Sequence, residues 1–327
     1  MIRNSNGEQR RYMNGLELSR AYFEEYGRPM LEEKFSEILH LLAVGFTGSG
    51  SEHYGFDDDI SRDHDFEPGF CIFIPGEDVI DRKTAFQLER AYAKLPKEYQ
   101  GVKRQMMSPV GGNRHGVMLT TDFFQNAVGS PDGKLSIEQW ISLPDYALAE
   151  STNGEIFFDN YGEITAIRER LLHMPEDILL KRIAGNLLIM AQSGQYNYIR
   201  CLKHGEPEAA QFACFDFVKA AMKVLFLLNG KYMPYYKWSF RALRQFEGIG
   251  NIPERLSFIL SGDNNDSQVS EMKYDYIENI ASEIIALLQK QEITKAICGD
   301  LEKHAYSVND FIRDSEIRNM NILAAVS

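Results

Sequence analysis

The chain lacks the features that mark membrane-embedded and disulfide-stabilised proteins. No run approaches the roughly 18 to 20 apolar residues that a bilayer span requires, and the polar N-terminal residues argue against a signal peptide. The four cysteines show no C-x-x-C spacing and lie mostly within apolar runs. They indicate reduced core residues rather than metal ligands or a disulfide framework. We therefore expect a cytoplasmic protein with no membrane partner.

Positive charge is also scarce. Lysine and arginine total 35 residues against 47 aspartates and glutamates, which gives a formal net charge of −12. Because nucleic-acid binding depends on clustered lysine and arginine, this balance argues against a nucleic acid as the main partner. A small cationic substrate fits the charge better. With 327 residues, 44% of them hydrophobic and 25% charged, the chain has a globular composition and room for two domains.

The most informative stretch is residues 48–66, GSGSEHYGFDDDISRDHDF. An apolar, strand-like run at residues 41–47 leads into a turn that contains Gly50 and Ser51. Glycine carries no side chain, so the backbone of such a turn can approach a phosphate group closely. The turn is therefore a candidate nucleotide-binding element.

Two aspartates follow this turn. Asp63 and Asp65 open a second apolar run at residues 66–74, and because residues two apart on a strand share a face, both carboxylates are expected to project together. An acidic pair at the start of a buried strand is costly without a cation, which favours a Mg²⁺ site that holds a nucleoside triphosphate. A solvated acidic turn is the alternative. A calcium loop that begins at Asp57 is excluded, since it would place Arg62 where glycine is needed.

This stretch resembles the signature of the polymerase-β-type nucleotidyltransferase superfamily, in which glycine-serine is followed by Asp-x-Asp and an apolar residue. More narrowly, it is similar to a bacterial family of uncharacterised proteins grouped under a domain of unknown function (DUF4037). In that family the serine is followed by glutamate, and the acidic pair is spelled Asp-His-Asp. The stretches FFDNYGEITAIRERL at 157–171 and KYMPYYKW at 231–238 extend the resemblance over most of the chain. The family name carries no established reaction.

The resemblance implies roles for individual residues. Asp63 and Asp65 would hold Mg²⁺ against a nucleoside triphosphate, with Gly50 and Ser51 beside the phosphates. ATP is the expected nucleotide. A third carboxylate on a neighbouring strand would position a second metal ion or deprotonate the acceptor hydroxyl.

The third carboxylate is the weak point of the resemblance. The run that should supply it, residues 115–124, has Met118 where the family's strand would carry an acid, and its first acid is Asp122. Met118 and Asp122 would share a face at strand spacing, so Asp122 is the candidate catalytic acid. Asp159, at the end of the next predicted strand, is either a turn residue or a weaker substitute.

Antibiotic nucleotidyltransferases resemble this layout, and in them a helical domain closes the cleft and sends a lysine toward the triphosphate. The matching position here is Lys237, within the aromatic and basic segment 231–238, for which packing is the alternative interpretation. Arg168 and Arg170 lie near the predicted domain junction, where a water-exposed helix face explains them equally well.

We predict an α+β fold. A nucleotidyltransferase-like mixed sheet flanked by helices is expected over residues 1–162, followed by an all-helical bundle domain over residues 163–327. The reason is that the apolar spacing changes from two residues to three and four after Asp159. The first domain is expected to contain the following elements: strands at 41–47, 66–74 and 155–158, an extended run at 116–124, and helices at 16–42 (broken at 27–29), 81–95 and 137–150.

Two functions from different classes follow. The first is a Mg²⁺-dependent nucleotidyltransferase that moves a nucleoside monophosphate from a triphosphate to a hydroxyl of an unidentified small-molecule acceptor. The second is a non-catalytic nucleotide-binding or interaction module, for instance one partner of a toxin–antitoxin pair, that retains the fold and the first two acids. The missing acid at Met118 favours the second function, and the intact Gly-Ser and Asp-x-Asp spacing favours the first.

Overall fold

The computed structural model describes residues 13–58, 60, 66–104 and 114–326. Its mixed four-stranded sheet and its many helices confirm the predicted α+β class. Internal contacts divide the chain into two units. The sheet unit comprises residues 1–134 and 150–171, and the helical unit comprises residues 135–149 and 172–327. This division differs from the predicted boundary after residue 162, and where independently folding domains end stays a prediction.

The sheet has the strand order β5-β2-β1-β6. Its strands are β1 (Ala43–Phe46), β2 (Cys71–Ile74), β5 (Gly116–Leu119) and β6 (Glu155–Asp159). β1 runs antiparallel to both β2 and β6, whereas β2 and β5 are parallel. A separate two-stranded ribbon pairs β3 (Glu98–Tyr99) with β4 (Val102–Lys103).

One end of this sheet gathers segments that are far apart in the sequence. The end of β1 lies beside the starts of its two neighbours, because Gly45 pairs with Cys71 and Phe46 pairs with Glu155. Cys71 in turn pairs with Gly116, the first residue of β5. The end of β1 and the starts of β2, β5 and β6 therefore share one end of the sheet, which we call the turn end. The ends of β2, β5 and β6 share the opposite, far end.

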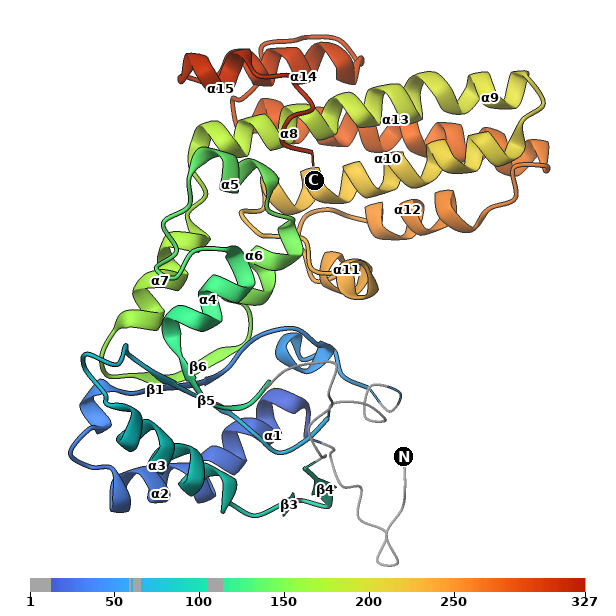
Figure 1. Ribbon diagram of the computed structural model, residues 1–327. Helices are drawn as coiled ribbons and strands as arrows, with labels where there is room; N and C mark the ends of the chain where they lie inside the picture. The colour runs from blue at the N-terminus through green and yellow to red at the C-terminus, as the bar shows by residue number, and fades with distance from the viewer. Residues whose placement is uncertain (1–12, 59, 61–65, 105–113, 327) are drawn as a thin grey trace, which may run out of the picture. The chain divides into compact units, whose positions relative to one another are not determined.

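Helices cover both faces of the sheet (Figure 1). One face carries α1 (Gly15–Tyr22), a π-helical turn (Phe23–Gly27), α2 (Arg28–Lys34) and α3 (Arg82–Ala93). Buried side chains of these helices, Tyr22, Phe23 and Leu88 among them, form one core with Val44 and Ile72 of the sheet. The other face carries α4 (Thr120–Val128) and α7 (Glu163–Leu172). There the ring of Phe123 packs edge-on against that of Phe73, with 5.3 Å between ring centroids.

The extended run predicted at residues 116–124 is wrong in its second half, because the chain enters helix α4 directly after β5. The buried side chains of α4 recur every four residues, which is the period of a helix: Thr120, Phe124 and Val128. Asp122 lies in the first turn of this helix, where the helix dipole favours a carboxylate. It therefore does not share a strand face with Met118.

The remaining predicted elements of the first domain agree with the observed ones in part: the helix predicted to residue 42 ends at Lys34, and the single helix predicted at 137–150 is two helices, Ile137–Ser142 and Asp145–Thr152. The strands predicted at 41–47 and 155–158 correspond to β1 and β6, and the helix predicted at 81–95 corresponds to α3. Of the strand predicted at 66–74, only the last four residues pair as β2. The break predicted at 27–29 is absent, because the π-helical turn carries the chain from α1 into α2.

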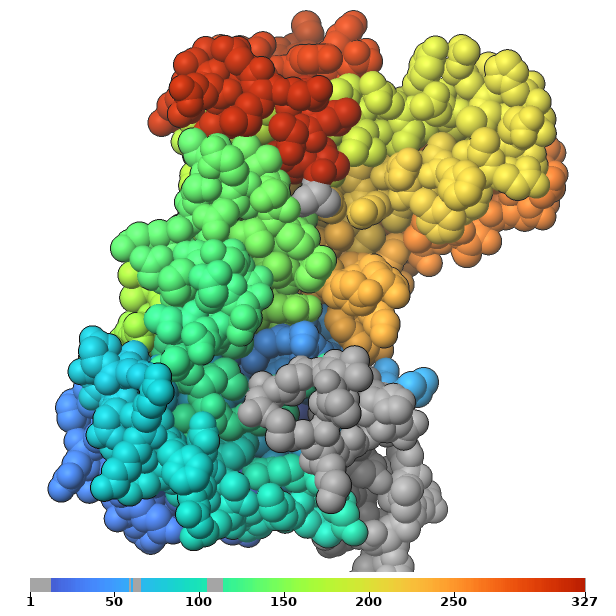
Figure 2. All heavy atoms as spheres, in the orientation of Figure 1, coloured from blue at the N-terminus to red at the C-terminus, as the bar shows by residue number. Residues whose placement is uncertain are grey.

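The helical unit is built from helices of very different lengths. They are α5 (Ile137–Ser142), the first part of α6 (Asp145–Thr152), α8 (Glu176–Met190), α9 (Ile199–Lys203), α10 (Pro207–Leu228), α11 (Tyr236–Leu243), α12 (Ile252–Ser261), α13 (Ser267–Lys290), α14 (Leu301–Asp310) and α15 (Ser315–Asn319). Helix α10 has more buried residues than α8 or α13, and it packs against α8, α12 and α13. Figure 2 shows the C-terminal segment, coloured red, on the surface of this unit. In the part of the chain that the structure describes, no strand follows residue 175, as predicted.

Within the described ranges, none of the helices is both long enough and apolar enough to cross a lipid bilayer.

Candidate functional site

The site begins at the turn that follows β1, residues 47–51. Gly50 has a φ angle of +121°, which L side chains rarely adopt, and a β-carbon there would meet the carboxylate of Glu52. The next residues form a short 3₁₀ turn, Ser51–Tyr54. Glycine at position 50 therefore lets the backbone reverse sharply at the turn end of the sheet.

Asn153, just before β6, holds this turn through three hydrogen bonds. Its side-chain oxygen accepts from the backbone N–H of Gly48 (3.0 Å) and from the hydroxyl of Thr47 (3.1 Å). Its side-chain nitrogen donates to the carbonyl oxygen of Gly48 (2.8 Å). The segment before β6 is thus fixed to the turn after β1, as the pairing of Phe46 with Glu155 requires.

Arg168 of α7 braces the same two segments. Its guanidinium donates to the hydroxyl of Thr47 (3.1 Å) and to the carbonyl oxygens of Thr152 (2.7 Å) and Asn153 (2.8 Å). Burial lowers the pKa of Arg168 to about 10. Arg168 is therefore a half-buried support of the turn and not part of a water-exposed helix face. Arg170 is exposed, and its guanidinium donates to the carbonyl oxygen of Asp132 (2.6 Å).

A buried polar cluster lies behind the turn. The ring of Phe46 stacks on His53 (4.2 Å between ring centroids) and on His115 (5.3 Å). Glu52 is 7% exposed, with its carboxylate 3.5 Å from Nδ1 of His53 and 3.8 Å from a guanidinium nitrogen of Arg114. Burial lowers the pKa of His53 well below its usual value, and His115 and Arg114 lower it further, so His53 is neutral at pH 7.

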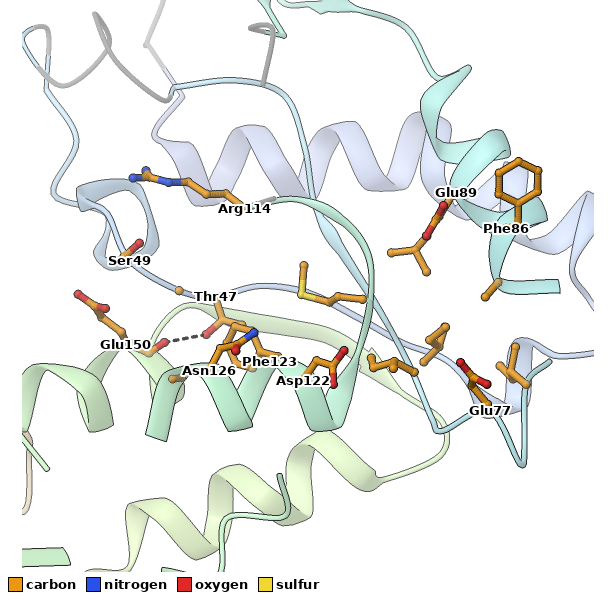
Figure 3. A pocket seen from close by; sticks show the side chains of 18 of the residues that line it. Thr47, Ser49, Glu77, Phe86, Glu89, Arg114, Asp122, Phe123, Asn126 and Glu150 are labelled. Atoms are coloured by element: carbon orange, nitrogen blue, oxygen red, sulfur yellow. Dashed lines mark hydrogen bonds between the residues drawn. The ribbon is translucent and has the colours of Figure 1, made fainter. Parts of the chain in front are cut away.

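The turn opens into a cavity of about 950 Å³ that lies within the sheet unit (Figure 3). The turn contributes Thr47, Gly48 and Ser49 to its lining, and β5 contributes residues 117–119. Helices α3 and α4 supply most of the other walls. A cavity of this size can enclose a ligand as large as a nucleotide.

Charged side chains are distributed along the cavity. Glu77 and Arg82 pair with each other, with 2.7 Å between Oε1 and Nε. The lining also includes Glu89, Asp122, Glu150 and Arg114. In Figure 3, Arg114, Ser49 and Glu150 lie at one end of the cavity, and Asp122 lies farther along toward Glu77.

Glu150 contacts the turn through its backbone carbonyl group. Its backbone carbonyl oxygen accepts from the hydroxyl of Thr47 at 3.4 Å, a bond that Figure 3 marks. Burial raises the pKa of the Glu150 carboxyl group, while the positive charge of Arg114 acts in the opposite direction. The carboxylate therefore lies in a partly dehydrated position within the field of Arg114.

The predicted phosphate-binding pair lies at the turn, but its two members differ in access. Gly50 supplies the unusual backbone conformation. Ser51 is 4% exposed, with its hydroxyl 3.5 Å from Oε2 of Glu52, and it does not line the cavity. Ser49 does line it. The predicted contact of Ser51 with phosphate stays a prediction, and the geometry favours Ser49 as the serine that faces a ligand.

The other predicted residues are distributed over the chain. Asp63 and Asp65 lie outside the described residues. Asp122 lines the cavity from α4, but at the far end of the sheet, because α4 begins where β5 ends. Asp159, also at the far end, accepts from the backbone N–H groups of Gly162 (2.7 Å) and Thr165 (2.8 Å). Of the two interpretations considered for Asp159, a turn residue or a substitute for the third acid, these bonds favour the turn residue.

Lys237 lies in the helical unit, on the exposed side of α11. The neighbouring Tyr235 packs on Tyr236 (4.4 Å between ring centroids) and on Tyr146 (5.8 Å). The aromatic segment thus packs within the helical unit, and the predicted role of Lys237 in nucleotide binding stays a prediction.

The fit of a magnesium ion depends on residues that the structure does not describe. Mg²⁺ prefers carboxylate oxygens in octahedral geometry. Among the residues described, no group of three or more His, Cys, Asp or Glu side chains is placed to hold a metal ion. The described residues therefore do not form a magnesium site by themselves, and the predicted one rests on Asp63 and Asp65.

Sequence reasoning missed several residues of the site, which are Ser49, Glu52, His53, Arg114, Glu150 and Asn153. Glu52 and His53 directly follow Gly50-Ser51 in the quoted motif, so their position was a usable signal. Glu150 carried no local signal, because its place beside the turn depends on β6 pairing with β1.

Comparison with known proteins gives one match. Residues 140–239 match the model of a family described as a domain of unknown function (DUF4037). The matched range includes Glu150, Asn153, Arg168 and Lys237, and it excludes the glycine turn. No curated protein and no solved structure matches the chain. The resemblance to nucleotidyltransferases therefore remains an expectation.

Proposed function

We propose that the protein is a Mg²⁺-dependent nucleotidyltransferase that transfers a nucleoside monophosphate from a nucleoside triphosphate to a hydroxyl of a small-molecule acceptor. One observation carries the proposal. A glycine turn at the end of β1 opens into a cavity of about 950 Å³, and Arg114 lies at the same end of that cavity. Backbone N–H groups of a glycine turn together with a guanidinium are a typical environment for phosphate oxygens.

The described residues would contribute to triphosphate binding in different ways. The turn is held rigidly by Asn153 and Arg168, so its backbone would not need to reorganise when a phosphate binds. Arg114 would neutralise part of the triphosphate charge. His53, neutral and buried behind the turn, adds no further charge to the site.

In the proposed reaction the acceptor oxygen attacks the α-phosphorus, and the bond from that phosphorus to pyrophosphate breaks. When bound, Mg²⁺ would supply neutralisation of the charge on the leaving pyrophosphate. The metal requirement is an expectation based on Asp63 and Asp65.

A non-catalytic nucleotide-binding module is the second candidate. It is favoured by the position of the two acids that were expected to complete the site. Asp122 and Asp159 both follow strand ends at the far end of the sheet, and the N–H groups of Gly162 and Thr165 occupy the carboxylate of Asp159.

Calorimetric titration with Mg²⁺ and each of ATP, GTP, CTP and UTP tests the shared part of both candidates. We expect one triphosphate to bind with a dissociation constant between about 1 μM and 1 mM. Arg114→Gln should weaken that binding about 10- to 100-fold, the usual value of a hydrogen bond to a charged group. Arg82→Gln is the matched control, since Arg82 lines the same cavity but is paired with Glu77, which lies away from Ser49 and Arg114 (Figure 3).

A screen for pyrophosphate release against pooled hydroxyl compounds then separates the candidates. Release that depends on an acceptor supports the transferase. Binding without release supports the module, and a wild-type protein that binds no triphosphate contradicts both.

A further inference from the structure

The turn end of the sheet brings together the end of β1 and the starts of β2, β5 and β6. An acid that acts beside the turn should therefore come from a segment that leads into one of these three strands. Asp122 and Asp159 follow strand ends instead. Glu150 lies in α6, shortly before β6 begins at the turn end. We propose that Glu150 is the carboxylate that accepts the proton of the acceptor hydroxyl; this assignment rests on the proposed transferase function.

Three contacts hold Glu150 in register with the turn. The Thr47 hydroxyl donates to its carbonyl oxygen, Asn153 binds both backbone groups of Gly48, and Arg168 ties Thr152 and Asn153 to Thr47. Glu150 also lines the cavity, at the end that Ser49 and Arg114 occupy (Figure 3). A side chain on a segment held in this way stays at a fixed distance from a ligand at the turn, and proton transfer requires such a fixed distance.

Asp122 has a different relation to the turn. It follows Leu119, which pairs with Ile74 at the far end of the sheet. The four residues of β5 separate the two ends by three steps, or about 10 Å, at the usual rise of a strand. Asp122 therefore lines the cavity at a position where it would contact the body of the acceptor. It is less suited to contact the acceptor oxygen that reacts beside the turn.

The surroundings of Glu150 suit a proton acceptor. Burial raises its pKa, which makes the carboxylate a stronger base than an exposed glutamate, and the positive charge of Arg114 acts in the opposite direction. Tyr54 also faces it, and burial raises the pKa of that phenol above 10, so Tyr54 stays neutral. The lining contains His53 as a further titratable group on this side, and it too is neutral.

The proton balance of the step is simple. The acceptor O–H bond breaks, its proton passes to a carboxylate oxygen of Glu150, and the acceptor oxygen forms a bond to the α-phosphorus. The bond from the α-phosphorus to pyrophosphate breaks, and pyrophosphate leaves with that electron pair. The carboxylic acid then returns its proton to solvent, so the enzyme is unchanged after each turnover.

The experiment compares Glu150→Gln, Asp122→Asn and Glu89→Gln with the wild type. Binding is measured by calorimetry with Mg²⁺ and the α,β-methylene analogue of ATP, and turnover is measured as pyrophosphate release from each triphosphate with pooled polyols and with water alone. We expect Glu150→Gln to bind the analogue within threefold of wild type and to lose turnover by about 10²- to 10⁴-fold, the range of a general base. Asp122→Asn and Glu89→Gln should each retain at least tenfold more turnover than Glu150→Gln.

The pH profile adds a readout that a structural role would not change. Wild-type turnover should rise with pH through the ionisation of Glu150, and this rise should be absent from the residual turnover of Glu150→Gln. The assignment is overturned if Glu150→Gln turns over like the wild type, or if it loses analogue binding as well. Wild-type binding without any turnover also overturns it, while nucleotide binding would still stand. A wild type that does not bind triphosphate instead refutes the proposed function itself.

Discussion

Two buried basic side chains, one in each unit, differ in how many hydrogen bonds they form. In the helical unit, Arg182 is 2% exposed and donates to Asp145 (2.5 Å) and to the carbonyl oxygens of Trp140 (2.5 Å) and Leu143 (2.6 Å), while its Nε has no hydrogen-bond partner among the described residues. In the sheet unit, His53 is equally buried, yet no described residue forms a hydrogen bond of standard geometry with either of its ring nitrogens. Glu150 is partly buried and faces the cavity.

The comparison contrasts side chains that are bonded within the fold with side chains that line a cavity. Lys181 and Lys273 follow the pattern of Arg182, since each ammonium donates to two or three oxygens of the helical unit. A buried polar group costs free energy unless it is hydrogen-bonded, so these networks are structural. His53 and Glu150 of the sheet unit instead line the cavity beside the turn.

The largest effect is expected in the helical unit. Arg182→Met leaves the buried carboxylate of Asp145 without its cation, so the free energy of unfolding should fall by about 3 to 5 kcal/mol. Chemical denaturation followed by circular dichroism measures it. Arg313→Met is the matched control, because Arg313 is 82% exposed in its pair with Glu176 and should contribute less than about 1 kcal/mol. Equal effects of the two variants would contradict the comparison.

An intermediate effect is expected where the turn is braced. Asn153→Ala removes the three hydrogen bonds to Thr47 and Gly48, and we expect a loss of about 2 kcal/mol in stability together with weaker triphosphate binding. Denaturation and calorimetry test the two parts separately. Asn160→Ala, which removes a single exposed hydrogen bond to Leu39, should leave binding unchanged. Unaltered binding in Asn153→Ala would show that the turn needs no bracing.

The smallest effect depends on pH. Because the folded protein keeps His53 neutral, the unfolded chain binds a proton that the native state does not, below the ordinary histidine pKa of about 6.5. The stability that His53 contributes is fully present above this pKa. It decreases as the pH falls below the pKa, by at most about 1.4 kcal/mol per pH unit. His53→Gln should remove this contribution, so the slopes of unfolding free energy between pH 7 and 5 should differ. Parallel slopes would mean that His53 is protonated in the native state.

The sequence predicted elements whose apolar period is unambiguous, such as the strand at 41–47 and the helix at 81–95, which the structure shows as β1 and α3. It failed at residues 120–124, since Thr-Thr-Asp-Phe-Phe fits a strand as well as a helix when only five residues are considered. At the site, the motif predicted the turn at Gly50. It could not predict Glu150, because the pairing of β6 with β1 joins residues more than a hundred positions apart.

The stack of His53 and His115 on Phe46 has a spectroscopic consequence. Protons that lie over an aromatic ring resonate at unusually high field, so the imidazole C–H signals of both histidines should separate from those of the chain's other histidines. Since His53 also lines the cavity, a ligand that occupies the turn would displace its signal. The protein thus contains its own NMR reporter of occupancy, readable without any label on the ligand.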